Sequence, residues 1–205
     1  MISVGSAAYL SCENRILGAF LFSVALFTIC SFGLSLYTGL AGYFFELKNK
    51  SELAVVWLGN LAGSLVGSLL IRLAKPSLSE KAAALFGVKF GQSIVATAAL
   101  AMFCGIMMYT AVRSFNESDS GTQSVFGVVV CIMTFIMCGF EHSIADMCYL
   151  WLAVGSAGTR RYSRTQPLCL MASRVASKTA GMSCVCWWPS TRRWPASSGK
   201  RPTTR

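Results

Sequence analysis

The segment from residue 138 to residue 147 reads Cys138-Gly139-Phe140-Glu141-His142-Ser143-Ile144-Ala145-Asp146-Met147. It lies within an apolar stretch that runs from about residue 125 to residue 152. Two adjacent ionisable side chains, Glu141 and His142, stand in the middle of that stretch. A charged side chain at the centre of a membrane helix costs about 2.5 kcal/mol or more. Such residues are functional candidates by default.

Gly139 precedes this pair and predicts a break in the helix, because glycine adopts backbone angles that other residues resist. At membrane depth a broken helix occurs only where the freed backbone groups are buried in protein or line a wet cavity. The segment therefore predicts the middle of a permeation path. The alternative interpretation is that Glu141 and His142 form a buried pair that only holds helices together.

The composition predicts a membrane protein that crosses the bilayer several times. The chain has 205 residues, of which 54% are hydrophobic and 13% are charged, and its mean hydropathy is +0.57. The net charge of +10 could suit a nucleic-acid partner, but residues 1–158 carry eight basic residues and all eight acidic ones. The body is neutral, so we expect the lipid bilayer and no nucleic acid as its partner.

The apolar stretches predict a series of spans separated by polar connections. Residues 1–11 are apolar but amount to about half of the ~20 residues that cross a bilayer. We interpret residues 1–11 as half of a first span, 16–45 as the second span and 53–73 as the third. A polar and weakly amphipathic connection at 75–90 leads to a fourth span at 91–112, and a hydrophilic loop at 113–123 leads to a fifth at 125–152.

Glycines interrupt the second span, at Gly33 and Gly39, as Gly139 interrupts the fifth. Glycine-broken spans at corresponding places in two halves indicate inverted repeats, with the pore where the broken helices meet. The alternative is that these glycines only pack against neighbours. In the third span, Gly59, Gly63 and Gly67 recur at four-residue spacing and predict a smooth helix face for close packing.

Two motifs resemble those of the formate/nitrite transporter family. The run from Gly139 to Met147 resembles the family signature, although the family pattern usually ends in Asn-Met where this chain has Asp146-Met147. The run Leu36-Tyr37-Thr38-Gly39 resembles the family loop that breaks the second span. The resemblance covers residues 1 to about 155.

The resemblance implies an all-α membrane protein with an aquaporin-like fold, inverted repeats, and broken second and fifth helices. It implies homopentamers in a cell inner membrane, with one pore per protomer that passes small monovalent anions such as formate or nitrite. No cofactor is implied, and no enzymatic activity. Two departures concern the pore: Gly105 stands where the family often has Asn, and Tyr37 where it more often has Phe.

The resemblance also implies roles for single residues. Thr38 matches the threonine that hydrogen-bonds the central histidine, here His142. Lys89 matches a basic residue at the outer vestibule. Phe22 and Phe135 match an apolar constriction on the outer side of the pore. The constriction on the cytoplasmic side is matched by Leu26, Leu36 and Tyr37.

The chemistry of these residues fits an anion path. An apolar constriction repels a carboxylate, whereas helix N-termini direct N–H groups and positive dipole ends at an anion. Because histidine titrates near neutrality, His142 can present a positive charge or a proton to the anion, or only polarise the site. Glu141 either sets the state of the histidine or hydrogen-bonds the broken helix. An intramembrane enzyme that uses Glu141 and His142 as an acid–base pair is a second hypothesis, but it lacks a nucleophile or a metal-ligand set.

The end of the chain differs from the body. Residues 159–205 contain no acidic residue and no apolar run near 20 residues, but many Arg, Ser, Thr, Trp and Pro. We interpret residues 156–205 as a disordered tail foreign to the family, translated out of frame where a sixth span should be encoded; a native basic tail is the alternative. Residues 1–155 are then a partial transmembrane domain with the sixth span missing, and a non-functional fragment is the alternative function.

Overall fold

The computed structural model describes residues 1–41, 51–118 and 120–154. These residues form eight helices and no strand. In chain order the helices are α1 (Ile2–Ser11), α2 (Arg15–Ser31), α3 (Tyr37–Ala41), α4 (Ser51–Ala74), α5 (Leu78–Phe90), α6 (Ile94–Glu117), α7 (Gly121–Met137) and α8 (Ser143–Ala153). The connection expected between the second and third spans lies mostly in residues 42–50, outside the described residues. The predicted tail, residues 156–205, lies wholly outside them.

Both expected helix breaks are present, and a glycine with a positive φ follows the end of the first helix in each. α2 ends at Ser31, and Gly33 (φ +62°) turns the chain before α3 begins. α7 ends at Met137, and Gly139 (φ +71°) turns the chain before α8 begins. Residues with a Cβ rarely adopt these angles, which explains glycine at both positions. Gly39, which was expected to help break the second span, instead lies within α3 and faces Val112 of α6.

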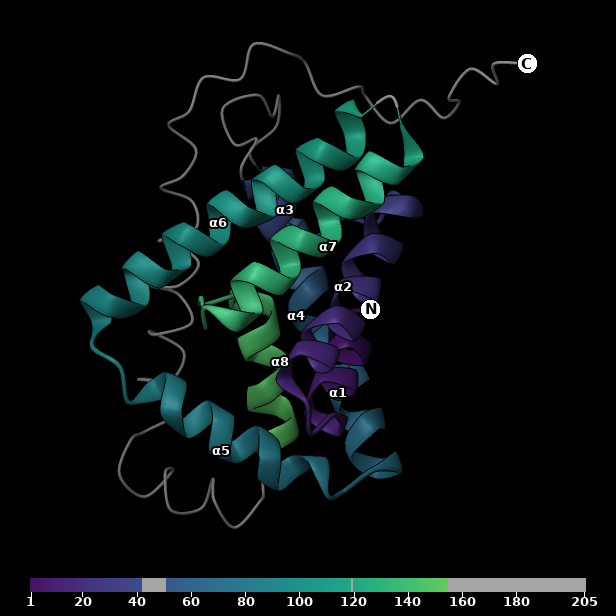
Figure 1. Cartoon of the computed structure of the whole chain (residues 1–205). Helices are drawn as coiled ribbons and strands as arrows, with labels where there is room; N and C mark the ends of the chain where they lie inside the picture. Colours follow the sequence, from purple (N-terminus) through teal and green to yellow (C-terminus); the bar gives the residue numbers. More distant parts are fainter. Residues whose placement is uncertain (42–50, 119, 155–205) are drawn as a thin grey trace.

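α8 occupies the centre of the packed helices (Figure 1). It packs against α4, α5 and α1, while α7 packs between α6 and α2. Ten of the 11 residues of α8 are buried, so this short helix has no face open to lipid or water. The buried apolar side chains form one cluster that includes residues of every helix in the described part. The two broken segments therefore end inside the protein.

Two polar connections differ from the sequence prediction. Residues 113–123 were predicted as a loop, but α6 continues to Glu117, because Arg113 Nε donates to Glu117 Oε2 at 2.9 Å across one helical turn. Residues 75–90 were predicted as a polar and weakly amphipathic connection, and most of them form the helix α5. One side of α5 is buried through Leu78, Ala82, Phe86 and Phe90, which explains why it forms a helix.

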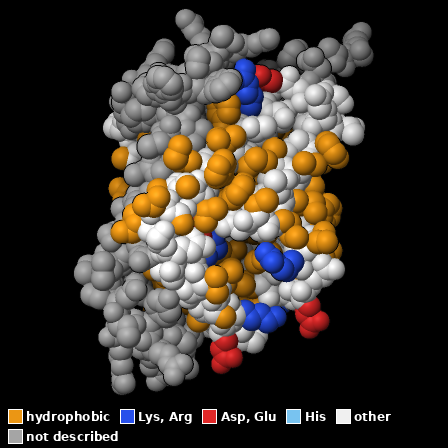
Figure 2. Space-filling view, turned by 60° about the vertical axis from the view of Figure 1, so that its left-hand side comes forward, with side chains coloured by type: hydrophobic (Ala, Val, Ile, Leu, Met, Phe, Trp, Pro, Cys, Tyr) orange, Lys and Arg blue, Asp and Glu red, His pale blue; other side chains and the backbone are white. Residues whose placement is uncertain are grey.

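The outer surface of the described residues suits a bilayer. α4 and α6 are long and apolar enough to cross a membrane on their own, and α1, α2, α7 and α8 are shorter apolar helices. Figure 2 shows hydrophobic side chains across the middle of one face, with charged side chains toward its two ends. On α4 the exposed apolar residues include Val55, Leu58, Val66, Leu70 and Leu73. Such a surface is stable only against lipid or another protein.

The close packing predicted for the glycine face of α4 is confirmed at Gly67. A Cβ there would lie 2.7 Å from Ser3 Oγ and 2.9 Å from Ser3 Cβ of α1. Gly59 and Gly63 have no described atom within 4 Å of such a Cβ. Close packing of these two glycines therefore stays a prediction, which now concerns a neighbouring subunit.

Leucine at Gly67 is expected to lower the thermal unfolding midpoint of the solubilised protein, because Ser3 is buried and its hydroxyl contacts Cys148 Sγ at 3.4 Å. Overpacking of this kind costs about 1–3 kcal/mol. Leucine at Gly63 is the matched control on the same helix; it is expected to reduce the oligomer fraction in size-exclusion chromatography, with a smaller effect on the midpoint. A Gly67→Leu protein as stable as the wild type would show that α1 and α4 do not meet here.

Candidate functional site

Thr38 and His142 meet where the two broken segments end. Thr38 Oγ1 lies 3.1 Å from His142 Nε2, and both side chains are buried. Thr38 is in the first turn of α3, and His142 is the N-cap residue of α8. We expected these side chains within about 6 Å, roughly two hydrogen-bond lengths, and this approach is confirmed.

The hydrogen bonds of the imidazole identify its resting state. Its Nδ1 accepts the backbone N–H of Ala145 at 3.1 Å, which caps the first turn of α8. An acceptor nitrogen carries no proton, so the single proton of a neutral imidazole is on Nε2. Nε2–H therefore donates to Thr38 Oγ1, so the threonine hydroxyl acts as the acceptor in this hydrogen bond. His142 at rest is a neutral donor that also holds the end of a helix.

Aromatic rings form a row beside the histidine. The ring centroids of Phe22 and Phe135 are 6.0 Å apart in an edge-to-face contact, and those of Phe135 and His142 are 5.7 Å apart. Phe22 is on α2 and Phe135 on α7, which pack together. Leu26 lies one turn after Phe22 on the same face of α2 and is buried. The structure thus places Phe22 and Phe135 together beside His142, with Leu26 buried one turn farther along α2. The division into an outer and a cytoplasmic constriction stays a prediction.

The other two predicted constriction residues, Leu36 and Tyr37, are buried at the start of α3. Asn60 of α4 holds this turn: its Oδ1 accepts the backbone N–H of Tyr37 at 3.1 Å, and its Nδ2 donates to the carbonyl of Ser35 at 3.1 Å. Asn60 was not among the residues predicted for the site. The available signal was an amide in the otherwise apolar span 53–73, because polar side chains in membrane helices commonly bond to a neighbouring segment.

Replacing Asn60 with leucine is expected to loosen this turn. It removes one acceptor and one donor. The N–H of Tyr37, a buried residue, then loses its partner, which costs ~1–3 kcal/mol, whereas the carbonyl of Ser35 is exposed. The measurement is amide hydrogen exchange, which should speed up over residues 32–38. Ser64→Ala is the matched control, since the Ser64 hydroxyl donates only within its own helix, to the carbonyl of Leu61. Unchanged exchange in Asn60→Leu would remove Asn60 from the site.

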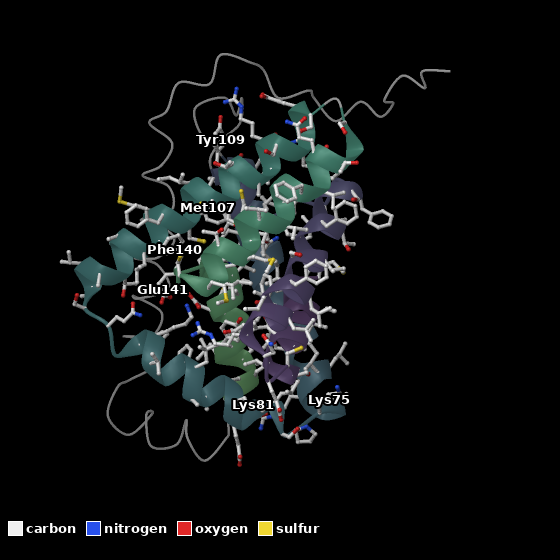
Figure 3. The ribbon with its side chains drawn as sticks, viewed as in Figure 1. Lys75, Lys81, Met107, Tyr109, Phe140 and Glu141 are labelled. Atoms are coloured by element: carbon white, nitrogen blue, oxygen red, sulfur yellow. The ribbon has the colours of Figure 1, made fainter. Side chains whose placement is uncertain are left out.

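Lys89, Glu141 and Asp146 form a buried ion triad behind the histidine. Lys89 Nζ lies 3.1 Å from Glu141 Oε1 and 3.4 Å from Asp146 Oδ1, and it also approaches the carbonyl of Phe140 at 3.5 Å. Glu141 lies at the junction of α7 and α8, on the side toward α5 and α6 (Figure 3). The structure places the ammonium group of Lys89, with a side chain 12% exposed, between two carboxylates. Its place at the outer vestibule stays a prediction.

A separate cavity lies away from this site. It has a volume of ≈ 390 Å³ and is formed at the C-terminal end of α6 and the start of α7, where Tyr109, Arg113, Glu117 and Gln123 line it. None of the residues proposed for the pore lines this cavity. It therefore adds no group to the contact between Thr38 and His142.

The sequence and the fold are similar to those of known membrane transport proteins. The sequence matches the family described as formate/nitrite transporter over residues 1–177. Among solved structures, the chain is similar to one described as a pentameric formate channel with formate bound, with a TM-score of 0.75 and 21% identity over 90% of this chain and 88% of that chain. No curated protein sequence matches. The family match passes residue 155, and the predicted domain boundary there stays a prediction.

Proposed function

The chain belongs to the formate/nitrite transporter family, and on this premise we propose that it carries small monovalent anions, such as formate or nitrite, through a pore in each protomer. The expected helical fold of the family is confirmed by the structural match. This family consists of transporters, so an intramembrane enzyme built on Glu141 and His142 is set aside. Which small anion is carried depends on the narrowest part of the path.

The contact between Thr38 and His142 is the observation that carries this proposal. It joins the two broken segments, and because Nε2–H of the histidine donates to Thr38 Oγ1, the threonine hydroxyl can donate its own hydrogen to an anion in an apolar interior. Donors fixed in a low-dielectric site stabilise an anion more than they would in water. The side chains of Phe22 and Phe135, and of Leu26 one turn farther along α2, present no polar atom that could replace the water around an anion. An anion that passes these side chains therefore gives up its water and meets the polar groups of Thr38 and His142.

A proton can follow the same path through His142. Protonating Nδ1 would remove the acceptor for the N–H of Ala145 and place two hydrogens against each other. The charged imidazole therefore requires the first turn of α8 to move, or the ring to turn toward the pore. This couples the charge of His142 to the geometry of the path, and it supports the proposal that an anion crosses with the proton as a neutral acid.

We infer a multi-pass protein in a cell inner membrane that assembles as a homopentamer. Two helices suited to span a bilayer and several shorter apolar helices support the multi-pass arrangement. The structural relative is described as pentameric. The exposed apolar face of α4, with Gly59 and Gly63 open, offers a surface that a second copy could cover.

Flux measurements on the whole chain test this proposal. The purified protein is reconstituted in liposomes, and uptake of formate, nitrite and gluconate is compared with uptake by empty liposomes. We expect formate or nitrite to enter faster than in empty liposomes, while gluconate, a much larger anion, does not. Equal uptake in protein-containing and empty liposomes, with a folded oligomer shown by size-exclusion chromatography, would refute transport by this chain.

A further inference from the structure

The polar cavity at the C-terminal end of α6 has no part in the contact between Thr38 and His142. Its volume of ≈ 390 Å³ lies within the roughly 300–1,000 Å³ that small-molecule sites in proteins occupy. The described residues that line it all carry polar side chains, and they include one cation, Arg113, and one carboxylate, Glu117. A ligand that carries one negative and one positive group matches this pair of charges.

The guanidinium group of Arg113 is held in place by its neighbours. Nε donates to Glu117 Oε2 at 2.9 Å, and Nη1 donates to the hydroxyl of Tyr109 at 2.7 Å. The guanidinium carbon also lies 5.7 Å from the centroid of the Tyr109 ring. Within the described part of the chain these contacts engage Nε and Nη1, so Nη2 keeps its N–H donors for a ligand. Planar guanidinium donors bind phosphate oxygens well.

Glu117 offers the matching acceptor one helical turn away. Its Oε2 accepts from Arg113, its side chain is 44% exposed, and Oε1 makes no hydrogen bond to the residues that the structure describes. A carboxylate oxygen accepts hydrogen bonds from an ammonium group. Ser114 and Ser118 also line the cavity, and their hydroxyl groups can donate to a phosphate. The cavity thus presents phosphate-binding donors and an ammonium-binding acceptor side by side.

The cavity lies at the level of a membrane surface. α6 is long and apolar enough to cross a bilayer, and the cavity is formed by its last turns and the start of α7. Figure 3 shows Tyr109 toward one end of the molecule, with Lys75 and Lys81 at the opposite end. Tyrosine is enriched where a membrane helix meets the headgroup layer. The polar lining therefore faces the depth at which phospholipid headgroups lie.

An apolar strip of α6 leads from the cavity toward the middle of the bilayer. Phe103 and Ile106 are 53% and 45% exposed. Ile106 precedes Arg113 by seven positions, about two helical turns, so both lie on one face of the helix. Thr110 stands between them, and its hydroxyl donates to the carbonyl of Ile106 at 2.9 Å. An acyl chain can lie along this strip while its headgroup reaches the cavity, which favours a lipid over a soluble ligand.

We propose that this cavity binds the headgroup of a zwitterionic phospholipid with a primary amine, phosphatidylethanolamine, taken from the surrounding membrane. Its phosphate contacts Arg113 Nη2 and the serine hydroxyls, and its ammonium group contacts Glu117. An anionic headgroup fits less well, because it sets a negative charge beside Glu117 without an ammonium group to compensate it. A trimethylated amine cannot donate a hydrogen bond to the carboxylate. The site concerns the lipid and is independent of which anion the chain carries.

Native mass spectrometry of the purified, full-length protein in detergent tests the proposal. Phosphatidylethanolamine, phosphatidylglycerol and phosphatidylcholine are added at equal concentrations, and each bound lipid is identified by its mass. We expect the wild type to retain phosphatidylethanolamine over the other two. Arg113→Gln should bind it about tenfold more weakly or worse, because charge-assisted hydrogen bonds to the phosphate are lost. Glu117→Gln should lose the preference and bind phosphatidylglycerol at least as well.

The control is Lys75→Gln, which removes a positive charge at the opposite end of the molecule and should bind lipid like the wild type (Figure 3). Soluble phosphoethanolamine at the concentration of the lipid should not displace it; displacement would assign the cavity to a soluble ligand and overturn the proposal. Equal binding of the three lipids by the wild type would also overturn it. If Arg113→Gln does not assemble, Glu117→Gln decides, and an unchanged preference for phosphatidylethanolamine in that variant contradicts the proposed site.

Discussion

Replacing Lys89 with methionine is expected to destabilise the protein by on the order of 3–5 kcal/mol, because it leaves buried carboxylates without their cation. Lys89 Nζ is within 3.4 Å of both Glu141 Oε1 and Asp146 Oδ1. Methionine keeps a similar length and fills the space, so the loss reports charge rather than volume. Thermal unfolding in detergent measures it, together with the fraction of oligomer that survives purification.

Two further variants separate the ion triad from other effects of losing a lysine. Lys81→Met changes the same helix. Among the described residues, Lys81 donates to the carbonyl of Leu10, at 3.2 Å, so a net loss of about 1 kcal/mol is expected. Combining Lys89→Met with Glu141→Gln and Asp146→Asn removes all three charges and should recover part of the stability. If Lys89→Met unfolds at the wild-type midpoint, the triad does not hold α5 to α8.

Replacing His142 with asparagine is expected to change the pH dependence of anion flux while the protein still folds. Asparagine is a favourable N-cap residue, so its Oδ1 can accept the N–H of Ala145 in place of Nδ1. Asparagine does not titrate, whereas an imidazole can gain a proton. Wild-type flux of formate, corrected for empty liposomes, should rise as pH falls and His142 gains a proton. The asparagine variant should lose that part of the rise.

Phenylalanine at the same position is expected to do more damage. It removes the cap of α8, which costs about 0.5–2 kcal/mol, and it leaves the Thr38 hydroxyl beside an apolar ring. The diagnostic in both variants is the pH profile together with the anion selectivity, since a pore without its histidine could leak faster. A His142→Asn protein with the wild-type profile and selectivity would reduce His142 to a structural residue.

The two helix breaks could be predicted from the sequence because their cause, a glycine, is local. A positive φ at Gly33 and Gly139 follows from the chemistry of glycine, and the ionisable residues after Gly139 stood out against an apolar background. The approach of Thr38 to His142 followed from two motifs of one family. These features depend on residues within a few positions of each other, or on a pairing that the resemblance already implied.

Other parts of the site depend on contacts between distant segments. Lys89 is 52 positions before Glu141, and its entry into the protein depends on how α5 packs on α8. Asn60 follows its hydrogen-bond partners Ser35 and Tyr37 by 25 and 23 positions. Hydrophobic periodicity does not predict such contacts between distant segments. The length of α6 was missed for a local reason: the ion pair of Arg113 and Glu117, four residues apart, extends the helix past its apolar part.

The route of the anion is tested most directly by blocking it. Leu26 is 1% exposed, one turn after Phe22 on the buried side of α2, whereas Val24, two residues away, is 50% exposed on another face. Formate flux into liposomes is measured for the wild type, Leu26→Trp and Val24→Trp, each shown to be oligomeric by size-exclusion chromatography. We expect Leu26→Trp to fall to the level of empty liposomes and Val24→Trp to conduct like the wild type. Undiminished formate flux through Leu26→Trp would show that anions do not pass beside Leu26.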